Sequence, residues 1–78
     1  MNRDKEGNMR RWVKDRQSLE AWGYNVYEMS RWHFRVACDW SPVIVDVWPS
    51  VRKYMVVGSS SALRYGDNIV DLFASIMQ

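Results

Sequence analysis

The fold is decided by residues 34–48, FRVACDWSPVIVDVW. Apolar side chains recur at every second position on both sides of the turn 39–42, as in two half-buried strands of a hairpin. On the face opposite the apolar one, the pairing brings Arg35 against Asp46, an oppositely charged cross-strand pair. Shifting the pairing by one residue would destroy the apolar pairs and the Arg35–Asp46 pair at once. The sequence therefore predicts a hairpin with three apolar pairs: Phe34–Val47, Val36–Val45 and Cys38–Val43.

The same pairing test extends the sheet past the turn 49–52. Pro49 cannot donate to a strand ladder, which suits the start of a turn. The next strand then places Tyr54 opposite Val47 and Val56 opposite Val45, again on the apolar face. On the other face Lys53 lies opposite Trp48, where a cation–π contact is expected.

A further strand is expected before the hairpin, over residues 24–29 with a turn at 30–31. This pairing places Tyr27 opposite Phe34 on the apolar face, and Glu28 beside His33 near Arg35. The turn contains neither glycine nor asparagine, so turn chemistry does not fix the register here.

Two helices flank the strands. Helical spacing of apolar residues predicts a first helix over 9–22, with Asn8 as N-cap and Gly23 as terminator. A loop is expected over 58–66, after which Asp67 caps a second, strongly amphipathic helix. The predicted apolar positions are Met9, Trp12, Val13, Leu19 and Trp22 in the first helix, and Ile69, Val70, Leu72, Phe73, Ile76 and Met77 in the second.

These elements predict a two-layer α+β fold, a four-stranded antiparallel meander with both helices on one face. Residues 1–8 are expected to form a flexible lead-in and residues 9–78 a single domain. The face under the helices would hold Tyr27, Trp32, Phe34, Val36, Val43, Val45, Val47, Tyr54 and Val56. The outer face would hold His33, Arg35, Ala37, Ile44, Asp46, Trp48, Lys53, Met55 and Val57.

Composition excludes several classes of protein. The 78 residues are 47% hydrophobic and 26% charged, which is globular composition in a chain long enough for one small core. One cysteine excludes an internal disulfide, and one histidine excludes a zinc site of the usual Cys/His kind. No apolar run is long enough to cross a membrane and no signal peptide is evident, so we expect a soluble cytoplasmic domain.

Catalytic chemistry is not indicated. Glu28, His33 and Asp46 are expected on a flat face with no sign of a cleft, and Cys38 points to the opposite side as a core residue. The run Gly58-Ser59-Ser60-Ser61 matches neither a P-loop nor a dinucleotide fingerprint. We expect no enzyme activity, no cofactor and no metal.

The outer sheet face is the predicted binding surface, because it mixes apolar and charged groups around a tryptophan. Two other interpretations stay open: these side chains finish the sheet surface, or a homodimer buries them. Trp40 at the hairpin tip either carries recognition or folds back onto the domain. The predicted partner contacts are Arg35, Trp40, Asp46, Trp48, Lys53 and Met55.

Positive charge gathers at the start of the chain. Residues 1–16 hold six basic and three acidic side chains, whereas the remainder holds five basic and six acidic ones. Clustered Lys and Arg are typical of phosphate binding, although a solvated helix face has the same appearance. A nucleic-acid module would use Arg10, Arg11 and Lys14 together with the outer sheet face.

Four segments are similar to small uncharacterised accessory proteins of tailed phages and prophages: Trp32–Val36, Val45–Ser50, Arg52–Tyr54 and Tyr65–Asp67. In that family an Arg-x-Asn-Gly hairpin leads into an Asp-Val-Trp-Pro strand and a Lys-Tyr or Lys-Trp. Here the longer turn Asp39-Trp40-Ser41-Pro42 stands in place of Asn-Gly, and the resemblance covers residues 27–67.

The resemblance implies a small accessory gene of a mobile element. Many such products bind and block a host machine, anti-CRISPR and other anti-defence proteins among them. We therefore expect a non-enzymatic protein that binds and inhibits a host protein or ribonucleoprotein. A nucleic-acid-binding module is the alternative, and a homodimer formed through the outer face is the third hypothesis.

Overall fold

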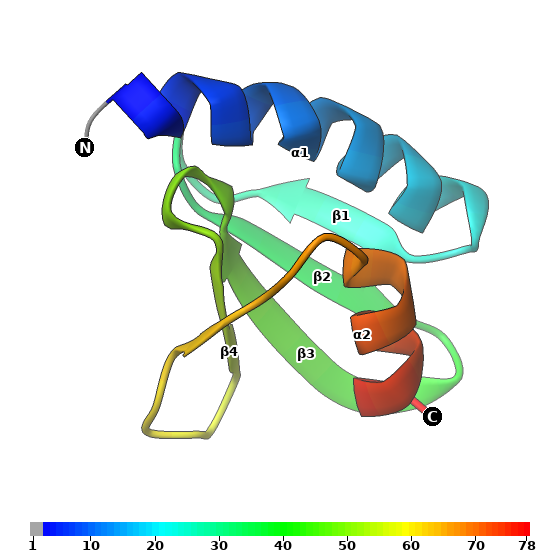
Figure 1. Ribbon diagram of the computed structural model, residues 1–78. Coiled ribbons are helices and arrows are strands. Elements are labelled where there is room, and N and C mark those ends of the chain that lie inside the picture. Colours follow the sequence, from blue (N-terminus) through cyan, green and yellow to red (C-terminus); the bar gives the residue numbers. More distant parts are fainter. Residues whose placement is uncertain (1–2) are drawn as a thin grey trace.

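A long N-terminal helix, α1 (Arg3–Ala21), crosses one face of an antiparallel sheet in the computed structural model, which describes residues 3–78 (Figure 1). The short helix α2 (Ile69–Ile76) packs on the same face and touches α1. The strands follow chain order across the sheet: β1 (Asn25–Glu28), β2 (Phe34–Cys38), β3 (Ser41–Trp48), β4 (Lys53–Val56) and β5 (Leu63–Arg64). The predicted α+β class, with both helices on one face, is confirmed, with a fifth strand added.

The β2–β3 hairpin has the predicted register over most of its length: Phe34–Val47, Arg35–Asp46 and Val36–Val45 are partners. Toward the turn the prediction is wrong, because Cys38 lies opposite Ser41 rather than Val43. A bulge between Val36 and Cys38 adds residues to β3 alone, so the turn shortens to Asp39-Trp40. Pro42 falls in the bulged segment, where its missing N–H costs the ladder nothing.

The β3–β4 pairing is as predicted throughout. Val45 lies opposite Val56, Val47 opposite Tyr54, and Trp48 opposite Lys53. The connection is a single 3-10 turn, η1 (Pro49–Val51), after which Arg52 takes the left-handed conformation with φ 54°.

The β1–β2 register differs from the prediction by one residue. Tyr27 lies opposite Arg35, and Glu28 lies opposite Phe34. In the connection between β1 and β2, Met29 N and Ser30 N both donate to the His33 carbonyl, at 2.8 and 3.0 Å. This connection is therefore one residue longer than the predicted two-residue turn. A one-residue shift reverses which face each side chain occupies. Tyr27 is consequently on the outer face.

Trp32 does not belong to the apolar face either. It lies in the connection between β1 and β2 and is 41% exposed. On the inner face of β1, Val26 packs against the core and Glu28 lies opposite Phe34, and buried Tyr24 comes just before the strand.

α1 begins six residues earlier than predicted. The segment expected to be a flexible lead-in is helical from Arg3, and residues 1–2 of that prediction lie outside the described residues. Asp4 and Glu6 in the first turn interact favourably with the helix dipole. Asn8 is not the N-cap, because its amide lies inside the helix and donates to the Ser50 carbonyl at 2.8 Å.

Gly23 ends α1 as predicted, with φ +100°. Gly23 N donates to the Glu20 carbonyl and Tyr24 N to the Leu19 carbonyl, each at 3.0 Å. This pair of bonds is the Schellman arrangement, which satisfies the last helical carbonyls and turns the chain into β1.

The region after β4 departs from the predicted loop. Leu63 and Arg64 form β5, which pairs with Tyr54 and Lys53 of β4. α2 is capped by Asn68 rather than Asp67, through a 3.1 Å bond from Asp71 N to Asn68 Oδ1. Asn and Asp cap equally well, so neighbouring candidates cannot be ranked by residue type.

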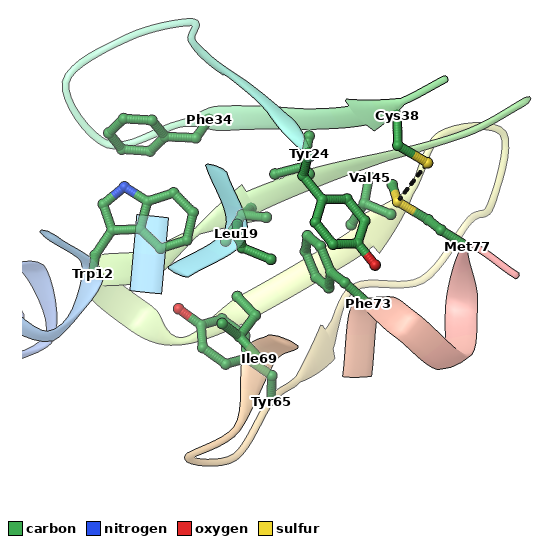
Figure 2. Packing of buried hydrophobic residues seen from close by; sticks show 12 residues of the cluster. Trp12, Leu19, Tyr24, Phe34, Cys38, Val45, Tyr65, Ile69, Phe73 and Met77 are labelled. Carbon is green, nitrogen blue, oxygen red and sulfur yellow. Dashed lines mark hydrogen bonds between the residues drawn. The ribbon is translucent and has the colours of Figure 1, made fainter. Parts of the chain in front are cut away.

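The core lies between the two helices and the inner sheet face (Figure 2). α1 contributes Trp12 and Leu19, whereas the predicted core positions Val13 and Trp22 are 56% and 71% exposed. Val13 lies one residue off the narrow buried stripe, and Trp22 lies beyond the helix end. The other buried apolar residues are Tyr24, Phe34, Val36, Cys38, Val45, Val47, Tyr65, Ile69, Phe73 and Met77.

Candidate binding surface on the outer face of the sheet

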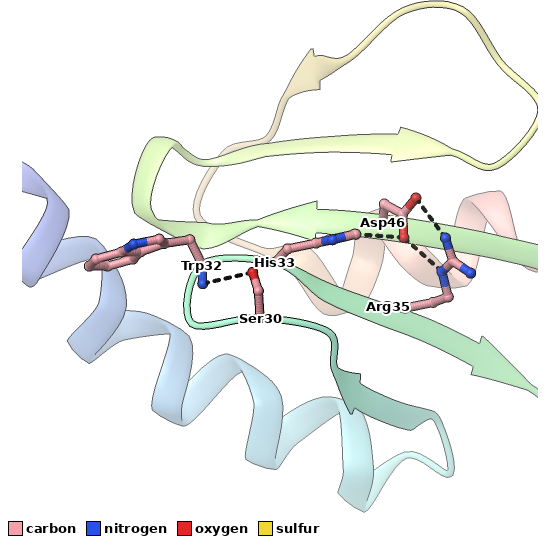
Figure 3. Close-up of polar contacts among 5 residues, drawn as sticks. All are labelled: Ser30, Trp32, His33, Arg35 and Asp46. Carbon is pink, nitrogen blue, oxygen red and sulfur yellow. Dashed lines mark hydrogen bonds and ion pairs between the residues drawn. The ribbon is translucent and has the colours of Figure 1, made fainter.

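Asp46 is the centre of a polar cluster on the sheet face away from both helices (Figure 3). Arg35 Nε donates to Asp46 Oδ1 at 2.8 Å and Arg35 Nη2 to Oδ2 at 3.3 Å, a two-pronged contact across the β2–β3 pair. His33 Nε2 lies 2.9 Å from the same Oδ1. These two partners cover the carboxylate, so Asp46 is 5% exposed although it faces outward.

His33 also positions Trp48. The two rings stack in parallel, with centroids 4.8 Å apart and an interplanar angle of 12°. Lys53 and Trp48 are cross-strand neighbours as predicted, but within residues 3–78 Lys53 forms no cation–π contact with Trp48. His33 Nε2 is buried, and Asp46 Oδ1 is its charged neighbour at 2.9 Å.

The cluster carries opposite charges. Burial of Asp46 raises the pKa of its carboxyl, but the hydrogen bonds and charges of Arg35 and His33 outweigh burial and lower that pKa below 3.8. The same bond to Asp46 raises the pKa of Arg35. A carboxylate and a guanidinium thus lie paired in the middle of the face at neutral pH.

A row of side chains crosses the outer face on four strands: Tyr27 on β1, Arg35 on β2, Asp46 on β3 and Met55 on β4. Tyr27 is 53% exposed, and sequence reasoning assigned it to the wrong face. The length of the connection between β1 and β2 is the signal that could have indicated the outward orientation of Tyr27. Arg35, Asp46, Trp48, Lys53 and Met55 are brought together on this face as predicted by the cross-strand register.

Trp40, also a predicted partner contact, does not lie on the outer sheet face. Its ring packs edge-on against Tyr24, with centroids 5.0 Å apart, and its Nε1 donates to the Met77 carbonyl at 2.9 Å. The side chain remains 49% exposed, but these contacts tie the hairpin tip to the ends of both helices. Trp40 was expected either to carry recognition or to fold back onto the domain, and the structure shows it folded back.

Of the three groups considered for acid–base chemistry, His33 and Asp46 lie in contact, whereas Glu28 is apart from them. Glu28 contacts Arg16 of α1 at 3.8 Å and not His33, because the shifted register turns it inward. Cys38 is buried, with its Sγ 3.9 Å from Met77 Sδ. Within residues 3–78, no group of three or more His, Cys, Asp or Glu side chains is placed to hold a metal ion.

The basic residues of α1 do not join the outer face. Arg10, Arg11 and Lys14 are exposed on a helix that covers the opposite side of the sheet. They line shallow hollows together with Arg52 and Arg64, which lie far from them in sequence. The surface predicted for a nucleic-acid module, with helix and sheet face acting together, is therefore split into two.

No helix within residues 3–78 has the length and apolar character needed to cross a membrane. No family model, curated protein or solved structure matches the chain. Its own residues must therefore carry any functional argument.

Proposed function

We propose that this protein is a small non-enzymatic accessory protein of a phage or mobile element that binds and inhibits a host protein or ribonucleoprotein. The contact is made by the outer sheet face. The observation that carries the proposal is the row Tyr27–Arg35–Asp46–Met55 with Trp48 beside it, on a face that neither helix covers.

The chemistry of this row supports a protein partner. Tyr, Trp and Arg are the residue types that dominate binding energy at protein interfaces, and methionine adapts to irregular apolar surfaces. Arg35 and Trp48 are held in place by Asp46 and His33, so little side-chain freedom is lost on binding. A preorganised, half-apolar face of this kind favours attachment over catalysis.

The resemblance to phage accessory proteins supports the same conclusion. The motif Asp46-Val47-Trp48-Pro49 supplies two members of the surface, Asp46 and Trp48, from the end of β3. The residues that carry the resemblance and those that carry the binding argument are thus partly the same. We propose the cytoplasm of the bacterial host as the place of action.

The test is capture of a partner from host lysate by tagged protein, with nuclease treatment, followed by affinity measurement with the purified partner. Tyr27→Ala and Trp48→Ala should each weaken binding about 30-fold, the effect of losing an interface hot spot of about 2 kcal/mol. Trp22→Ala is the matched control, because Trp22 is 71% exposed and lies off the sheet.

Three outcomes overturn the proposal. The first is a partner that binds both outer-face variants as tightly as the wild-type protein. The second is an inhibition assay in which the purified partner keeps full activity when saturated. The third is a dimeric mass in solution that Tyr27→Ala converts to a monomer, which would assign the face to a second copy of this chain.

A further inference from the structure

Three adjoining hollows run along α1 where the helix faces η1 and β5, with volumes of about 410, 380 and 550 Å³. The largest shares Arg11 and Arg52 with one neighbour, and Asp4, Asn8 and Arg64 with the other. They therefore form one continuous depression, here named the basic groove.

The basic groove gathers most of the positive charge of the chain. Of the ten Lys and Arg residues within residues 4–78 seven line it, whereas of the nine Asp and Glu residues there only three do: Asp4, Asp15 and Asp67. The rest of the chain is accordingly acidic in balance. The basic members are Lys5, Arg10, Arg11, Lys14, Arg52 and Arg64, with Lys53 at the rim toward the outer face.

Most of these cations are available to a ligand. Arg10, Arg11, Lys14 and Arg64 are exposed, and within residues 4–78 none of them forms an ion pair. Arg52 is anchored instead: its guanidinium lies 5.0 Å from the centre of the Tyr65 ring, donates to the Gly66 carbonyl and lies 3.5 Å from Asp67. One fixed arginine among several free basic side chains suits a ligand with repeated negative charges.

The length of the basic groove and the residues that line it indicate which class of polyanion it binds. From Asp4 to Lys14 the helix rises about 15 Å, which spans four to five nucleotides of one strand at about 3.4 Å each. None of the described residues that line the groove is aromatic, so it has no platform for stacking unpaired bases. Single-strand binders depend on such stacking, whereas backbone contacts alone suit bases that remain paired.

We propose that the basic groove binds the sugar–phosphate backbone of a nucleic-acid duplex without reading its sequence. Arg10, Arg11, Lys14 and Arg64 contact successive phosphates. This inference stands independently of the proposed function, because none of the residues that carry the proposed protein contact, Tyr27, Arg35, Asp46, Trp48 and Met55, lines the groove. The two surfaces adjoin at Lys53 and its cross-strand partner Arg64.

The test measures fluorescence anisotropy of labelled duplex DNA, duplex RNA of the same sequence, and the corresponding single strand. If four phosphates are neutralised, the slope of log K against log salt is about −3.6, so the affinity falls about 150-fold between about 50 and 200 mM salt. Binding of either duplex in preference to the single strand supports the proposal, and the stronger of the two identifies the kind of nucleic acid.

The variants Arg11→Gln and Arg64→Gln should each weaken duplex binding several-fold and make the slope shallower by about 0.9. Arg31→Gln is the matched control, since Arg31 is exposed, lies outside the groove against Trp32 and makes the same change in charge. Trp48→Ala should leave duplex binding unchanged, which separates this result from that of the proposed function.

Four results would overturn the inference. They are no duplex binding at about 50 mM salt, equal loss in Arg31→Gln and Arg11→Gln, tighter binding of the single strand, or displacement of the duplex by polyglutamate at equal charge concentration. The last result would assign the groove to an acidic protein surface.

Discussion

Asp46 is a charged residue that is buried by its own partners. It points away from the core, yet Arg35 and His33 cover it, so that only 8% of its side chain is exposed. A carboxylate so far removed from water depends on those partners, because an unpaired charge in that place would be costly. The pair therefore fixes both the register of β2 against β3 and the shape of the outer face.

Asp46→Asn should lower the free energy of unfolding at pH 7 by about 2 kcal/mol, the cost of losing charged hydrogen bonds. The folded-state pKa of Asp46 is lowered, so its contribution is fully present above 3.8, the usual Asp pKa, and is lost as the pH falls below that value. Urea unfolding from pH 7 to pH 2 measures the difference between wild type and variant.

The matched control is Asp39→Asn, which removes an exposed carboxylate that forms no ion pair within the described part of the chain. We expect it to leave stability within about 0.5 kcal/mol of the wild-type value. A difference between Asp46→Asn and the wild-type protein that stays constant down to pH 2 would contradict the assigned pKa direction.

At the scale of elements, the junction between α1 and β1 is closed by a contact distant in sequence. Gly23 has positive φ, and the Trp40 ring of the β2–β3 turn lies over it: a Cβ at Gly23 would be 3.3 Å from Trp40 Cζ3. The same indole donates to the Met77 carbonyl at the end of α2. One side chain thus joins the ends of both helices to the hairpin.

Gly23→Ala should be more destabilising than Gly58→Ala. Both residues have φ near +100°, so both variants suffer backbone strain of about 1 kcal/mol. Only at Gly23 does the added methyl group meet a neighbour, whereas at Gly58 nothing lies within 4 Å. We expect a further loss of about 1 kcal/mol at Gly23, measured by the urea midpoint. Equal midpoints would show that the Trp40 contact is readily displaced.

The whole molecule depends on a small core. A chain of 78 residues has a free energy of unfolding of about 4 to 12 kcal/mol. Its α2 helix is only eight residues long and too short to be stable alone, but the helix and its C-cap supply the buried side chains Ile69, Phe73 and Met77. The sheet and α1 therefore need α2, and α2 needs them, which makes folding cooperative.

Phe73→Ala should remove about 3 to 5 kcal/mol, the usual cost of emptying a fully buried phenylalanine site. That is a large part of the free energy of unfolding of a domain this small, so the melting temperature should fall by at least about 12 °C. Val13→Ala, at a position 56% exposed, is the control and should unfold within a few degrees of the wild-type protein. Similar melting temperatures for the two variants would contradict the assignment of Phe73 to the core.

The candidate surfaces were predictable to different degrees. The outer-face residues on β2, β3 and β4 followed from alternation and cross-strand charge, because the register of those strands is set by pairs within a short stretch of chain. Tyr27 was misplaced because a single residue in the preceding connection decides its face. The basic groove needed Arg52 and Arg64, whose nearness to α1 has no local signal in the sequence.

Local patterns in the sequence were enough to predict the α+β class, the hairpin register over Phe34–Val36, the end of α1 at Gly23 and the amphipathic α2. Each depends on contacts between residues close in the chain or on a backbone preference of one residue type. The start of α1, the strand β5, the position of Trp40 and the assembly of the basic groove became known from the three-dimensional structure alone. These rest on packing between distant segments, where burial and long-range hydrogen bonds override local propensity.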